Sequence, residues 1–108
     1  MNEYLLNLHM HTTYSDGSGS HADIAQAALR AGIDVVIVTD HNVLVHGPEG
    51  YAAENGRRLL MLIGEEIHDQ AREPQKNHLL VFGHSTELAQ HAADPQGLID
   101  RVHEAGGI

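Results

Sequence analysis

Two histidines lie one residue apart near the start of the chain, in the segment Asn-Leu-His-Met-His. The alternating pattern from Tyr4 to His11 is typical of a β-strand and places His9 and His11 on the same face. Asp16 follows in segment 12–19, where an Asp-Gly pair predicts a turn. Because imidazole is a common ligand of transition metals, these residues could bind a metal ion where the strand ends.

Each later apolar segment also carries a histidine or an acid at one of its ends. These residues are Asp40 and His41 after 34–39, Glu65 and Glu66 after 59–63, and His78 at the start of 78–83. In a parallel α/β fold, such positions meet at one edge of the sheet. Imidazole nitrogen and carboxylate oxygen together suit divalent ions, and two ions about 4 Å apart can hydrolyse a phosphate ester.

The composition agrees with metal binding by nitrogen and oxygen. The 108 residues include ten histidines and no cysteine, which excludes disulfides, thiolate metal sites and thiol nucleophiles. A formal charge of -9 disfavours nucleic acid as a partner. The sequence contains neither an apolar run long enough for a membrane segment nor the basic start of a signal peptide, so we expect a cytoplasmic protein.

The apolar periodicity predicts an α/β fold with about four mainly parallel strands and flanking helices. The predicted strands cover residues 4–11, 34–39, 59–63 and 78–83. The second and third are almost continuously apolar, as expected for strands that are buried on both faces. A loop with a short helix over 49–55 is expected between them.

Two helices are predicted from their capping residues. The first begins after Ser20, with Asp23 at the third helical position, and ends at Gly32. The second begins with Asp94 and Pro95 and ends at Gly106. The last two residues, 107–108, have the pattern of a strand that is beginning.

The order and spacing of these motifs resemble the PHP (polymerase and histidinol phosphatase) superfamily. The matching segments are His9-Met-His11 with Thr13 to Gly17, Val38 to Asn42, Gly64 to Ile67, and His78 to Gly83. The resemblance covers 6–108 and implies a metal-dependent hydrolase, most often a phosphoesterase, on a distorted (β/α) barrel. It also implies up to three ions at the mouth of that barrel.

The resemblance also implies a ligand set for divalent Zn, Mn or Fe. By position, His9 and His11 would bind a first ion, Glu66 would bridge to a second, His78 would bind the second, and Asp16 and His41 a third. A later histidine and a late Asp-x-His pair of the family have no counterpart here. We therefore expect residues 1–108 to be the N-terminal part of one PHP-like domain, truncated at its C-terminus, with two to three ions in the complete domain.

The remaining polar residues are expected to have other roles. Asp40 is given a catalytic supporting role, in which it orients His41 or a neighbouring ligand, and Glu65 is expected to be a surface or supporting acid. His21 is expected to take part in local helix capping. Loop or surface positions without a metal are expected for His46, His68, His84, His91 and His103.

Three hypotheses about function follow from the resemblance. The first is a phosphoesterase in which a metal-bound hydroxide attacks a small, phosphorylated ester. The second keeps the site but cleaves a carboxylic or carbamic ester, and the third is a PHP module that binds metal without turnover. Because a partial barrel exposes strand edges, we also expect self-association.

Overall fold

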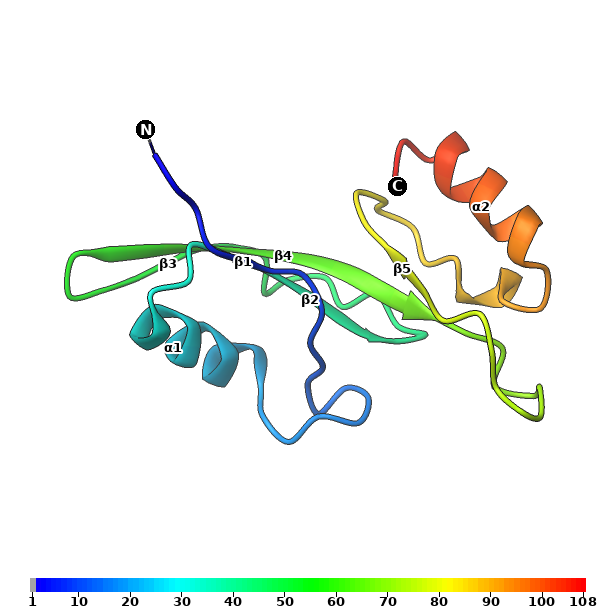
Figure 1. Cartoon of the computed structure of the whole chain (residues 1–108), viewed down its shortest axis with the longest axis horizontal. Coiled ribbons are helices and arrows are strands. Elements are labelled where there is room, and N and C mark those ends of the chain that lie inside the picture. The colour runs from blue at the N-terminus through cyan, green and yellow to red at the C-terminus, as the bar shows by residue number, and fades with distance from the viewer. Residues whose placement is uncertain (1) are drawn as a thin grey trace.

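The computed structural model describes residues 2–108, which form one sheet with a helix against it and a second helix beside its far end (Figure 1). In chain order the elements are β1 (Leu6–Asn7), α1 (His21–Ala31), β2 (Val35–His41), β3 (Gly50–Glu54), β4 (Arg57–Ile67), β5 (Leu79–Val81), the 3-10 turn η1 (Ala89–His91) and α2 (Pro95–Glu104). No helix within residues 2–108 is both long and apolar enough to span a membrane.

Three strands of the sheet are parallel and two are antiparallel to their neighbour. The order is β1-β2-β4-β3, and β5 pairs with the other half of β4. β1 and β4 flank β2 in parallel, while β3 and β5 both run antiparallel to β4. The predicted α/β class is confirmed. Within the described residues the sheet does not close, which is consistent with a partial, distorted barrel.

The segment around residue 50 differs from the prediction. Residues 49–55 do not form a short helix, because Gly50–Glu54 is strand β3 and makes a hairpin with β4. Asn55 and Gly56 connect the two strands with φ of 51° and 78°. A two-residue turn with positive φ at both positions suits Asn-Gly and matches the twist of a hairpin. The Asn55-Gly56 turn therefore explains why residues 50–54 form a strand paired with β4 and not a helix.

The first predicted strand is regular only at Leu6–Asn7. The chain nevertheless continues beside β2, since the Thr39 amide donates to the Met10 carbonyl at 2.8 Å. β4 extends beyond its predicted apolar run at both ends, from Arg57 to Ile67. His9 and His11 lie in the irregular segment after β1, and Glu66 lies in the extended end of β4. Both segments bring their predicted ligands to the same edge of the sheet.

Helix α1 covers one face of the sheet and begins and ends as predicted. The Ser20 side chain accepts from the Asp23 amide, and Gly32 takes the left-handed conformation with φ 78°. The core beneath it consists of Ala28, Leu29, Val36, Val38, Leu59 and Met61. On the opposite face Leu62 is 40% exposed. The prediction that β4 is buried on both faces is therefore wrong at Leu62.

Helix α2 packs against the far end of the sheet, beside β5 (Figure 1). Its N-cap is Asp94, whose carboxylate accepts from the Gly97 amide, and Pro95 is its first residue, as predicted. A second core joins this helix to the strands through Ile67, Val81, Leu88, Leu98 and Val102. Phe82 and Ile108 exchange both backbone hydrogen bonds, at 2.7 and 2.9 Å, beyond β5. The last residues therefore lie alongside the chain that leaves β5.

Candidate metal centre

The register of the two central strands creates the core of the site. β2 and β4 are paired so that His41 lies beside Glu66 and Asp40 lies beside Glu65. Neighbouring positions in a strand point to opposite faces, so His41 and Glu66 share one face while Asp40 and Glu65 share the other. The predicted ligands are thus separated from the two acids that precede them in each strand.

His9 and His11 reach the same place from the other side of β2. Their ring nitrogens Nε2 lie 3.3 and 3.1 Å from Oε2 of Glu66. His41 Nδ1 lies 3.3 Å from the same oxygen and stacks on His11 with 4.4 Å between ring centroids. Three imidazoles from two segments therefore surround one carboxylate oxygen.

The second oxygen of Glu66 faces a different histidine. His78, at the start of the segment that leads into β5, places Nδ1 3.4 Å from Glu66 Oε1. Burial would raise the pKa of Glu66, but the hydrogen bond with His9 and the charges of His41, His9 and His11 outweigh burial and lower it. The group is therefore a carboxylate at neutral pH, with each oxygen directed at a separate set of imidazoles.

Asp16 lies at the exposed rim of the cluster. Its oxygens are 3.8 Å from His11 Nδ1 and 3.3 Å from His41 Nε2, and its side chain is 66% exposed. The loop can turn back here because Gly17 passes close to the His11 carbonyl, where an added Cβ would collide. Asp16 and His41 are thus neighbours, and their binding of a common ion stays a prediction.

Asp40 holds this loop in place and does not orient His41. Its carboxylate, in a residue only 1% exposed, accepts from the Thr12 amide at 2.6 Å, the Thr12 hydroxyl at 2.7 Å and the Ser15 hydroxyl at 2.6 Å. Burial would raise the pKa of Asp40, but these hydrogen bonds from Ser15 and Thr12 outweigh it and lower the pKa. The role that the geometry gives to Asp40 is positioning of the segment between His11 and Asp16.

Glu65 and His84 form a buried pair on the other face. Both side chains are fully buried, and His84 Nε2 lies 2.8 Å from Glu65 Oε1. His84 lies in the loop after β5, as expected, but it is buried and not at the surface. Glu65 is buried as well, so of its two expected roles the surface acid is wrong. No local pattern signals this pair, because the two residues belong to different elements and lie 19 positions apart.

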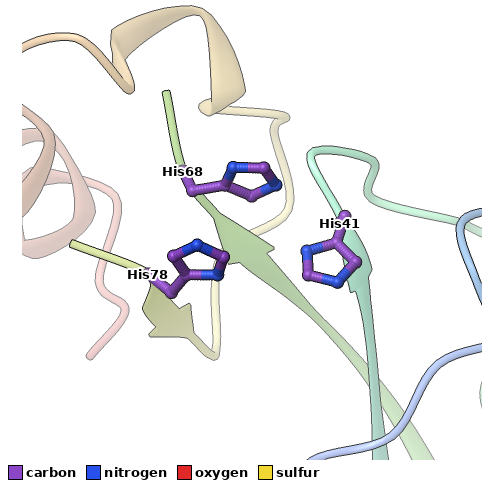
Figure 2. Close-up of side chains that lie close together, drawn as sticks. All are labelled: His41, His68 and His78. Atoms are coloured by element: carbon purple, nitrogen blue, oxygen red, sulfur yellow. The ribbon is translucent and has the colours of Figure 1, made fainter. Parts of the chain in front are cut away.

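His68 belongs to the cluster, although a loop or surface position without a metal was expected for it. It directly follows β4, is 6% exposed, and stacks on His78 with 4.4 Å between ring centroids (Figure 2). Burial and the charges of His78 and His41 lower the pKa of His68. The charges of Glu66 and Asp69 act in the opposite direction but do not outweigh them. The alternation Glu66-Ile67-His68 was the available signal, since residues two apart on a strand share a face.

The donor atoms in this region fall into three groups that could hold a metal ion. The groups are His9 with His11 and Glu66, His11 with Asp16 and His41, and His41 with His68 and His78; within each group the atoms lie within 4.8 Å of one another. His11 Nδ1 and His41 Nδ1 are buried without a hydrogen-bond partner. Buried polar atoms rarely stay unpaired, so these donors fit a bound cation.

A polar cleft of about 500 Å³ opens beside the histidines. Its walls are Tyr14, Ser15, Asp16, His41, His68, Gln70, Gln75 and His78. Arg57 and Arg58 are remote from it, because they begin β4 and Glu66 lies near its other end, about 30 Å away at 3.3 Å per residue. They instead contact the Leu29 carbonyl and the Tyr51 ring.

Comparison with known proteins identifies the family. The PHP domain matches residues 7–106, and the chain belongs to this family, a superfamily of metal-dependent hydrolases whose members typically bind divalent metals. An uncharacterized protein of Methanocaldococcus jannaschii is 27% identical over 94% of the chain and 63% of its own length. The DNA polymerase/3'-5' exonuclease PolX of Bacillus subtilis is 38% identical over 44% of the chain and 8% of its own length. No solved structure matches the chain significantly.

Proposed function

We propose that this chain forms the metal-binding part of a hydrolase that cleaves phosphoesters of small molecules. The observation that carries the proposal is the surroundings of Glu66, whose Oε2 faces three imidazoles and whose Oε1 faces a fourth. A carboxylate with ligands on both sides can bridge two cations. Two-cation sites are well suited to an in-line displacement at phosphorus.

The residues would divide the work as follows. His9, His11 and Glu66 would hold one ion, Glu66 and His78 a second, and Asp16 and His41 a third. Divalent cations held in this way lower the pKa of water and stabilise charge on the ester oxygens. Asp40 keeps the loop from Thr12 to Ser15 closed over β2, which fixes the approach to the site.

The cleft beside the histidines supports an anionic substrate. Tyr14 offers a hydroxyl group, and Gln70 and Gln75 offer amide donors, all on its walls. Arg72 and Lys76 are exposed in the same loop as the two glutamines. Such neutral donors and nearby cations suit a phosphate group better than an uncharged ester.

Assays of the purified protein, loaded with Mn²⁺ or Zn²⁺, test the proposal. The panel contains phosphomonoesters, phosphodiesters and aryl carboxylic esters; the phosphodiesters are included because one relative is named as a 3'-5' exonuclease. We expect metal-dependent release of phosphate or alcohol from phosphoesters. We also expect His11→Ala to abolish turnover and His103→Ala, on the exposed side of α2, to leave it unchanged.

Three results would contradict the proposal in different ways. Hydrolysis of carboxylic esters alone would show that the protein cleaves a carboxylic ester bond and not a phosphoester bond. Stoichiometric metal with no turnover on the whole panel would indicate a module that binds metal without catalysis. Phosphoester hydrolysis that survives His11→Ala would show that the activity comes from another site or from a contaminating enzyme.

A further inference from the structure

We propose that His68 is a metal ligand and that, with His41 and His78, it completes a three-histidine site for one transition-metal ion. The inference rests on the proposed function, because it adds a ligand to the same metal centre. It also goes beyond it, since neither the sequence motifs nor the family resemblance gives His68 a role. The site would lie entirely within this chain.

The three rings converge from three separate segments (Figure 2). His41 is the last residue of β2, His68 follows β4, and His78 precedes β5. The planes of His68 and His78 are parallel to within 3°, and His41 is nearly perpendicular to both, at 87° and 88°. Each ring offers one nitrogen, and these nitrogens lie within 4.8 Å of one another. This spacing allows one ion to contact all three rings.

The backbone fixes His68 in this position. The His68 amide donates to Asn42 Oδ1, and the Asn42 amide group donates back to the His68 carbonyl, each at 3.0 Å. Asn42 itself takes a left-handed conformation, with φ 54°, directly after His41. The end of β4 is thus clamped to the end of β2. The clamp holds His68 and His41 side by side, as a preorganised site requires.

His68 also carries an unpaired ring nitrogen in a buried environment. The residue is 6% exposed, and Nδ1 has no hydrogen-bond partner. Leaving a buried polar atom unpaired is unfavourable, so such atoms in a folded protein usually have a partner. Stacking on His78 satisfies the ring faces but not the nitrogen. A cation coordinated in the plane of the ring, through a nitrogen lone pair, would give the buried imidazole a polar partner.

The number of ions follows from which residues the groups share. His11 and His41 each occur in two of the three candidate groups. A neutral imidazole has only one free lone pair, so each of these residues can serve one ion at a time. The two groups with no common residue are His9 with His11 and Glu66, and His41 with His68 and His78. The three-histidine site therefore takes His41 from the third ion that the proposed function gives to Asp16 and His41, and we expect the chain to bind two ions.

The chemistry of the donors restricts the metal. Three neutral imidazoles suit Zn²⁺, Co²⁺, Ni²⁺ or Cu²⁺ and disfavour Mg²⁺ and Ca²⁺, which require oxygen ligands. Three protein ligands also leave an open position, which is typical of catalytic zinc sites. His41, His68 and His78 all line the polar cleft, so this open position would face the substrate.

Equilibrium dialysis with Zn²⁺ and Co²⁺ tests the stoichiometry. The wild-type chain should bind two equivalents, and His68→Gln should lose one of them. His103→Gln, on the exposed side of α2, is the control and should keep both. A His68→Gln variant that binds two equivalents with unchanged affinity would overturn the inference.

A cysteine variant tests direct contact and does not depend on a loss of binding. The natural chain has no cysteine, so His68→Cys introduces a single thiol. With Co²⁺ it should give a thiolate-to-cobalt charge-transfer band, which the His103→Cys control should lack. Absence of the band in a folded, cobalt-loaded His68→Cys protein would overturn the inference.

The two proposals fail in distinguishable ways. If His68→Gln keeps its metal while His11→Ala loses an equivalent and phosphoesterase activity, only the role of His68 is wrong. If the wild-type protein binds no transition metal, both the metal centre and the role of His68 are wrong.

Discussion

Glu66 and His41 face each other across two parallel strands, with Glu66 Oε2 3.3 Å from His41 Nδ1. The register between β2 and β4 produces this contact, and the other imidazoles join it from segments that flank the two strands. A single carboxylate therefore connects residues that are far apart in the sequence.

Removing the charge of Glu66 should affect more than one ion. Glu66→Gln keeps the shape of the side chain but replaces a carboxylate that faces four imidazoles. We expect metal affinity to fall by more than about tenfold, the lower limit for losing even an outer partner of a metal ligand. Isothermal titration with Zn²⁺ measures this. Glu104→Gln at the exposed end of α2 is the control, and equal affinities for the two variants would contradict a central role of Glu66.

Replacing Asp40 should destabilise the loop that carries Asp16. Asp40→Asn puts an amide where one carboxylate accepts three hydrogen bonds, so at least one buried donor loses its partner. We expect the free energy of unfolding to decrease by about 1–3 kcal/mol. Urea denaturation measures it, and Asp100→Asn, in an exposed side chain on α2, should change it by less than about 0.5 kcal/mol. Equal effects of the two substitutions would be evidence against the loop contact.

The same carboxylate should make stability depend on acid. The pKa of Asp40 is lowered in the folded protein from an ordinary value of 3.8. Its contribution is therefore present above pH 3.8 and is lost as the pH falls through the lower folded pKa. The wild-type protein should lose stability in this acid range more steeply than Asp40→Asn. Parallel stability curves for the two proteins would contradict the assignment.

Metal affinity should also depend on pH, in a range above that of the Asp40 carboxylate. Imidazole binds metal only when neutral, and its reference pKa is about 6.5. We expect the bound metal to decrease as the pH falls below about 6, measured by dialysis at a series of pH values. Metal content that is unchanged at pH 5 would count against ligation by histidine.

The core beneath α2 should respond to a matched pair of substitutions. Leu98 is 1% exposed and packs against Ile67 and Val81, whereas its neighbour Ile99 is 37% exposed. Leu98→Ala should lower the free energy of unfolding by about 2–5 kcal/mol, as for other buried leucines. Ile99→Ala should cost clearly less, and a larger cost for Ile99 would mean that α2 faces the other way.

Much of the fold could be predicted from local sequence signals. Ser20, Gly32, Asp94 and Pro95 mark helix ends because each satisfies or removes an unpaired backbone group at that end. The hairpin of β3 was missed, although Asn55-Gly56 is a strong signal for such a turn. The irregular backbone after Asn7 was not predictable, because the alternation of residue types continues through it.

The candidate site was partly predictable for the same reason. Ligands at the ends of parallel strands share an edge, so the alternation that orients His9 and His11 is enough to suggest a cluster. The buried pair of Glu65 with His84 required knowledge of which elements touch. His68 could have been found by extending β4 by one residue beyond Ile67, because it then shares a face with Glu66.

The most direct test of the metal centre is anomalous scattering from crystals soaked with Zn²⁺ or Mn²⁺. We predict an anomalous peak at about 2.0–2.2 Å from the donor atoms of His9, His11 and Glu66, as is usual for nitrogen and oxygen ligands. Metal-soaked crystals with no peak at these three side chains, or with peaks only elsewhere on the protein, would contradict the account.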